Sequence, residues 1–149
     1  MLLNFLLTVV FNVLLAEVPF YIKTKDGIIV FTDSAFTGTS NAVKLEVVSD
    51  NIIRVTASPS ATITERNSLI TVYSAYPNLK WDVQESEEKI VLKTRRLIAT
   101  VMVNTGAVSF TDITGKPILR EKQINGRSFE PAVFEGEKLY QIKQTFETT

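Results

Sequence analysis

The chain has 149 residues, of which 45% are apolar, so it is long and apolar enough to build a single buried core. Its 16 basic and 16 acidic side chains balance and are scattered, which argues against a clustered basic face for binding nucleic acid. The sequence contains no cysteine and no histidine, which excludes disulfides, thiolate nucleophiles, imidazole bases and zinc sites built from these residues. We therefore expect neither a nucleic-acid partner nor a metal site.

The first 16 residues carry no charged side chain and end at Ala16, directly before Glu17. This run is shorter than the roughly 20 residues that span a bilayer, and it fits the apolar core of a secretory signal. We expect residues 1–16 to be a signal peptide and residues 17–149 to form one β domain, with no membrane contact beyond the export signal. No basic residue precedes the run and Leu14 is large for its position, so a buried strand or helix and a membrane anchor stay alternative interpretations. With a working signal, the protein would be exported to the periplasm or the extracellular space.

Residues 18–32 contain the strongest hairpin signal, because Asp26-Gly27 stands between two runs rich in β-forming residues. A type I′ turn favours this pair, so we expect these two residues to form the turn. Residues 34–41 are small and polar and predict a loop.

Residues 42–57 predict a second hairpin that turns at Asp50-Asn51. Its apolar side chains alternate with polar ones, and they are Val43, Leu45, Val47, Ile53, Val55 and Ala57. On the opposite face, we expect Arg54 to lie across from an acidic residue such as Glu46.

The middle of the chain predicts further short strands, at Ser68–Ser74, from Trp81 onward and at Ile90–Leu92. The next residues predict a meander. Side chains alternate along a strand at Leu97–Val103, the chain turns at Asn104–Gly106, and a returning strand follows at Ala107–Thr111.

A second turn follows at Asp112–Gly115, where the aspartate can accept a hydrogen bond from a nearby amide, and Pro117–Glu121 forms the next strand. Residues 121–136 are irregular, with Asn125-Gly126, Pro131 and Gly136 as breakers, and Leu139–Phe146 alternates as a last strand. No amphipathic helix follows residue 16. About ten short strands at roughly ten-residue spacing predict an all-β antiparallel sandwich.

The stretch from Lys93 to Glu121 resembles the N-terminal β-domain of glycoside hydrolase family 31, the α-glucosidase and α-xylosidase family. The matching residues are Thr94, Leu97, Val101, Val103, Gly106, Phe110, Asp112, Gly115, Leu119 and Glu121. The resemblance is also visible at 42–58, and each of these residues has a structural explanation.

The resemblance implies a complete or incomplete galactose-mutarotase-like β-sandwich that packs on the catalytic (β/α)₈ barrel of the same polypeptide and lends a loop to the active-site rim. The parent enzyme would hydrolyse α-linked oligosaccharides of glucose or xylose with retention and without a cofactor. In the family the catalytic aspartates lie in the barrel, which takes about 250 residues, and the Trp-x-Asp-Met motif is absent here. We therefore assign no catalytic residue, and we expect the 149 residues alone to be inactive.

Aromatic rings are the candidates for sugar binding, because pyranose faces stack on them. We single out Trp81 and Tyr76, which lie close together in sequence, and core packing is the competing interpretation of Trp81. Exposed rings at Tyr73, Tyr140 and Phe36 would be further candidates. A free-standing carbohydrate-binding or interaction sandwich is the alternative function.

Carboxylates are numerous and weakly informative. Glu85, Glu87 and Glu88 cluster in an expected turn, where a solvated face explains them. Glu121 and Glu147 lie at strand ends, where surface or interdomain contacts are the expected role.

Overall fold

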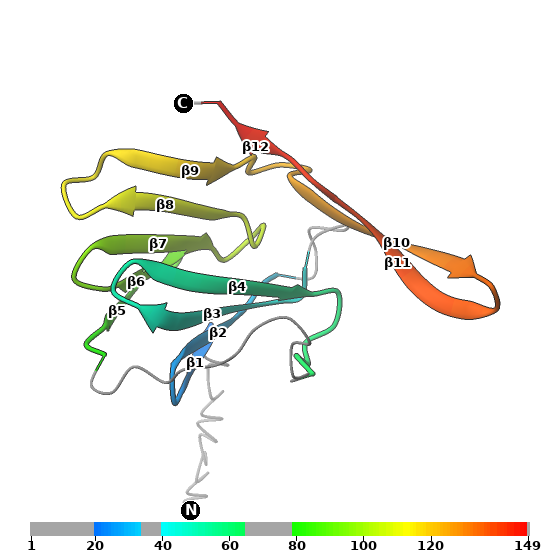
Figure 1. The fold of residues 1–149 in the computed structure, drawn as a ribbon, viewed down its shortest axis with the longest axis horizontal. Coiled ribbons are helices and arrows are strands. Elements are labelled where there is room, and N and C mark those ends of the chain that lie inside the picture. The colour runs from blue at the N-terminus through cyan, green and yellow to red at the C-terminus, as the bar shows by residue number, and fades with distance from the viewer. Residues whose placement is uncertain (1–19, 34–39, 65–78, 149) are drawn as a thin grey trace, which may run out of the picture.

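The computed structural model describes residues 20–33, 40–64 and 79–148, and these residues form twelve strands and no helix. All pairings between the strands are antiparallel, so the expected all-β sandwich architecture is confirmed (Figure 1). The expected signal peptide, the strand at Ser68–Ser74 and Tyr76 lie outside the described residues.

Within these three described ranges, no helix has the length and apolar character needed to cross a membrane.

The first sheet has four strands in sequence order. They are β1 (Tyr21–Thr24), β2 (Gly27–Phe31), β3 (Ala42–Ser49) and β4 (Ile52–Ser58). The second sheet has six strands in the order β12-β9-β8-β7-β6-β5. Their bounds are Asp82–Glu85 for β5, Lys89–Lys93 for β6, Leu97–Met102 for β7, Val108–Asp112 for β8, Pro117–Glu121 for β9 and Phe146–Glu147 for β12.

Among the described strands, β10 (Arg127–Phe134) and β11 (Glu137–Gln144) pair only with each other. We call this pair the ribbon. Figure 1 shows that the ribbon leaves the second sheet between β9 and β12 and extends beyond the two packed sheets.

The core lies between the two sheets and is built by alternate residues of their strands. The members of the core cluster with no exposed surface are Ile28, Val30, Val43, Leu45, Ile90, Leu92, Ala99 and Val101. Each comes from a run in which apolar residues recur at every second position, so the period of two places them on one face. The expected inward face of the second hairpin is thereby confirmed.

The turn between β1 and β2 differs from the expected one. Thr24 pairs with Gly27, so Lys25 and Asp26 form the turn and Gly27 opens the next strand. Neither Asp26 nor Gly27 has a positive φ, which rules out the type I′ turn expected at this pair. Close packing explains why glycine is needed here, because a Cβ on Gly27 would lie 1.9 Å from the backbone oxygen of Leu45.

Positive φ is found instead at Glu135 and Gly136, with φ of 50° and 84°, in the two-residue loop of the ribbon. Positive φ at both central residues is the pattern of a type I′ hairpin. Gly106 and Gly115 also have positive φ, so the two turns expected in the meander are confirmed.

Residues 121–136 are more regular than expected. Pro131 lies inside β10 and pairs with Tyr140, so the break predicted at this proline is wrong. Each strand of a two-stranded ribbon has one open edge, and a proline without an amide proton is tolerated there. At the other end, the expected last strand is divided at Thr145, so that β11 pairs with β10 and β12 pairs with β9.

Candidate functional site: a protruding ribbon on a buried anchor

A buried ion pair connects the ribbon to the second sheet. Glu121 ends β9, Arg127 begins β10, and their side chains are 1% and 7% exposed with Arg127 Nη2 2.6 Å from Glu121 Oε2. The amide of Val108 donates to the same oxygen at 2.9 Å, and Gln144 Nε2 donates to the other oxygen at 3.2 Å. The carboxylate therefore has partners on β8, β10 and β11. Our expectation of a surface or interdomain contact for Glu121 was wrong.

The ion pair also reaches Ser40, which lies between β2 and β3 of the first sheet. Arg127 Nη1 donates to the buried Ser40 Oγ at 3.1 Å. Gly106 leaves room for that hydroxyl, because a Cβ at this glycine would lie 2.8 Å from it. Burial lowers the pKa of Arg127, and the negative charge of Glu121 opposes this effect. We call Glu121, Arg127, Ser40 and Gln144 the anchor.

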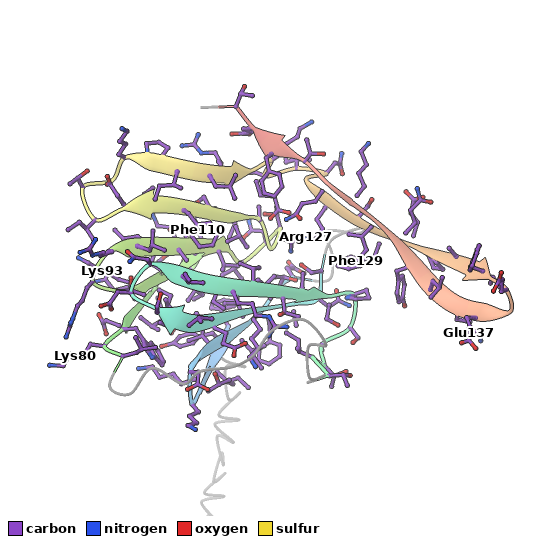
Figure 2. The ribbon with its side chains drawn as sticks, in the orientation of Figure 1. Lys80, Lys93, Phe110, Arg127, Phe129 and Glu137 are labelled. Atoms are coloured by element: carbon purple, nitrogen blue, oxygen red, sulfur yellow. The ribbon has the colours of Figure 1, made fainter. Side chains whose placement is uncertain are left out.

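Beyond the anchor, one face of the ribbon is apolar. The pairs Phe129–Ile142 and Pro131–Tyr140 follow Arg127–Gln144 on this face, as the register of the two strands requires. The rings of Phe129 and Tyr140 are perpendicular, with their centroids 6.2 Å apart. Figure 2 shows Arg127 at the base of the ribbon, Phe129 farther along it and Glu137 at its distal turn.

The distal part of the ribbon, residues 132–139, exposes large apolar side chains on both faces, and we call it the tip. Val133 is 72% exposed on one face, while Phe134 and Leu139 are 65% and 48% exposed on the other. Large apolar side chains that are exposed on both faces of one strand pair favour burial against another surface.

A second apolar surface lies where β4 begins, beside the second sheet. Leu119 pairs with Phe110, which packs on the core, so Leu119 lies on the core-facing side although it is 39% exposed. Together with Ile52, Ile53 and Ile118 it borders an open hollow of about 270 Å³. Within the described part of the chain, the first sheet has four strands and the second has six, so this part of the inner face is not covered by a described strand.

A third feature is a hollow of about 350 Å³ between the ribbon and the end of β4. Residues 56–60 and 62–64 form one wall, and Tyr140 forms the other. We call it the Tyr140 hollow. Tyr140, a candidate for sugar binding only if exposed, is 54% exposed here.

The structure does not bring the two predicted sugar-binding residues together among the residues it describes. Trp81 is half-buried and packs against the core cluster, so only part of its indole reaches the surface. Tyr76 lies outside the described residues.

The predicted carboxylates occupy structural positions. Glu85, Glu87 and Glu88 are exposed around the turn between β5 and β6, as expected. Asp112 accepts hydrogen bonds from the amides of Thr114 and Lys116 at 2.8 and 3.0 Å, which confirms its role in the turn. In the described ranges, no group of three or more acidic side chains could hold a metal ion.

Sequence reasoning missed the anchor and the Tyr140 hollow. The only signal for the anchor was a glutamate and an arginine on either side of the Asn125-Gly126 turn, which is also the pattern of a solvated loop. The hollow joins residues about 80 positions apart, and no local pattern indicates such a contact.

No family model matches the chain. Its structure is similar to part of the glycoside hydrolase family 31 α-xylosidase from Xanthomonas citri, with a TM-score of 0.73 and 33% sequence identity. The match covers 85% of this chain and 13% of that protein, so the chain spans a small part of the length of its structural neighbour. This similarity agrees with the resemblance seen in the sequence and is consistent with a domain related to family 31.

Proposed function

We propose that this chain is the non-catalytic N-terminal β-sandwich domain of a retaining α-glycosidase of family 31, which hydrolyses α-xylosides or α-glucosides. The observation that carries the proposal is the similarity to the α-xylosidase, at 33% identity over 85% of this chain. Because the match covers only 13% of that protein, the proposed role is that of one part of a larger enzyme.

The chemistry of the described carboxylates supports a non-catalytic role. Glycoside hydrolysis generally needs two carboxyl groups that flank the scissile bond, and retaining enzymes hold them about 5–5.5 Å apart. Glu121 is instead buried against Arg127, Asp112 closes a turn, and Glu46 lies 3.9 Å from Arg54 on the neighbouring strand. These carboxylates are bound to neighbouring groups and are not arranged around a substrate cleft.

The proposed partner of the domain is the catalytic (β/α)₈ barrel of the same polypeptide. The tip offers exposed apolar side chains on both faces, and the anchor holds the base of the ribbon in one orientation. Such an apolar projection fits a role in docking and in shaping the rim of the active site. With residues 1–16 acting as an export signal, the enzyme would work in the periplasm or outside the cell.

A chimera tests this function. The matched segment of the Xanthomonas citri α-xylosidase is deleted or replaced by residues 17–149 of this chain, and hydrolysis of an aryl α-xyloside is measured. We expect no turnover by the 149-residue chain or by the deleted enzyme, and restored turnover by the chimera. Turnover by the 149-residue chain, or a chimera no more active than the deletion, would contradict the proposal.

A second candidate function is a free-standing carbohydrate-binding sandwich, which the Tyr140 hollow favours. It differs from the first in requiring no barrel, so it predicts sugar binding and no rescue of the deleted enzyme.

A further inference from the structure

We propose that the Tyr140 hollow binds the ring of a neutral saccharide, with one sugar face stacked on Tyr140 and the sugar hydroxyls directed at the wall of serines and threonines. The inference deepens the proposed function. The choice of xylose and glucose as ligands rests on that function. The existence of the site rests on the lining of the hollow.

The aromatic wall is preformed. Tyr140 is 54% exposed, so a ligand can reach its ring, and the perpendicular Phe129 ring braces it at a centroid distance of 6.2 Å. A ring that is already oriented loses little side-chain entropy when a ligand stacks on it. Sugar rings present apolar C–H groups to such a surface and release water from it.

The opposite wall offers hydrogen-bond acceptors in a fixed arrangement. The hydroxyls of Ser58 and Ser60 both donate to the carbonyl oxygen of Thr62 at 2.9 Å. The two hydroxyl oxygens lie 3.1 Å apart. Because each hydroxyl uses its single proton within the wall, lone pairs remain for donors from a ligand. Sugar hydroxyls are such donors.

The charge and size of the hollow define the ligand class. Among the described residues, the lining contains hydroxyl, amide and apolar groups and no charged side chain. A charged ligand would lose its hydration there without an ion pair in return. The volume of about 350 Å³ lies within the range of small-molecule sites, which run from about 300 to 1,000 Å³. A neutral monosaccharide unit or a short oligosaccharide end satisfies both conditions.

The test is to titrate the ¹⁵N-labelled 149-residue chain with α-linked xylose and glucose disaccharides. Binding is monitored by the changes in amide chemical shift in NMR spectra. We expect saturable shifts at residues 56–64 and around Tyr140. Tyr140→Ala should weaken binding about tenfold, whereas Tyr140→Phe keeps the stacking face and binds as before. Phe134→Ala is the matched control, because it removes an exposed aromatic ring of the same ribbon outside the hollow.

Ser60→Val provides a second probe that leaves the ribbon intact, and it should also weaken binding. The inference is overturned if no shifts saturate in the millimolar range, or if Trp81→Ala abolishes binding while Tyr140→Ala does not. Either result leaves the chimera experiment untouched, because rescue of hydrolysis by the chimera depends on docking and not on the hollow.

Discussion

Glu121 and Arg127 form a 2.6 Å ion pair with both side chains buried, only six residues apart in sequence, where β9 gives way to the ribbon. Because Val108, Ser40 and Gln144 bond the same two side chains, the pair holds both sheets and both ribbon strands to one point. Because the ribbon has no further strand neighbour among the described residues, it would otherwise depend on its turn and its own register.

Arg127→Met should destabilise the chain by about 3–5 kcal/mol, because it leaves the buried Glu121 carboxylate without its counter-ion. Urea unfolding followed by circular dichroism measures the change. The matched control is Arg120→Ala, which removes an exposed contact of 3.7 Å to Glu147 and should cost no more than about 1 kcal/mol. Equal effects of the two substitutions would show that the anchor contributes nothing particular to stability.

Thr94→Val should cost about 1–3 kcal/mol. Its hydroxyl donates to the carbonyl oxygen of Asp50 at 2.8 Å and accepts from the amide of Leu97 at 2.9 Å, so it links the turns of two sheets. Valine keeps the shape of the side chain and leaves these partly buried backbone groups without their bonds to the Thr94 hydroxyl. Thermal unfolding checks the prediction, with Thr111→Val on β8 as the control. A melting temperature unchanged from the unsubstituted chain would contradict it.

The elements that sequence predicted well are those in which local pattern and tertiary packing agree. The alternation of Val43, Leu45 and Val47 fixed one face of β3, and burial of that face follows from the period of two. Gly115 and Asp112 marked a turn whose hydrogen bonds are all local, so no distant contact could change it.

The features that sequence failed to predict depend on distant neighbours. The sequence indicated a turn at Gly27, but glycine is needed there because the backbone of Leu45, eighteen residues away, approaches it closely. Pro131 looked like a breaker because its tolerance depends on an open ribbon edge. The anchor depends on Ser40 and Arg127 meeting across 87 positions. Local propensity carries no information on any of these contacts.

A glycine required by close packing, such as Gly27, can be distinguished by experiment from one required by a positive φ, such as Gly115. At Gly27 the φ is not positive, but an added Cβ would lie 1.9 Å from Leu45 O, so Gly27→Ala forces the backbone of β3 to move. We expect a loss of more than about 3 kcal/mol. Gly115 has φ of 88° and open space around it, so Gly115→Ala should cost only about 1–2 kcal/mol. Denaturant unfolding of both variants measures the two losses. A larger loss for Gly115→Ala than for Gly27→Ala would contradict the prediction.

The pKa of Asp112 is lowered from its ordinary value of 3.8, first by the hydrogen bond from the Thr114 hydroxyl and then by the amide of Lys116. A lowered pKa means that the ionised form stabilises the fold above pH 3.8, and that this stability is lost as the pH falls through the pKa of the folded state. Thr114→Val should therefore raise the pKa of Asp112, and the stability difference from the unsubstituted chain should shrink in acid. An NMR titration of the Asp112 carboxyl group checks the direction of this pKa change. An unchanged pKa in Thr114→Val would contradict the prediction. Thr111→Val is the control.

The tip should matter for docking and not for the stability of the isolated domain. Val133 and Phe134 are 72% and 65% exposed, so changing both to serine should alter unfolding free energy by no more than about 1 kcal/mol. In the chimeric α-xylosidase the same double change should lower hydrolysis sharply, because it removes the apolar area that the barrel would cover. The matched control replaces Glu130 and Gln141, an exposed polar pair on the same ribbon, with serine. Equal activity of the two chimeras would mean that the tip makes no contact with the catalytic part.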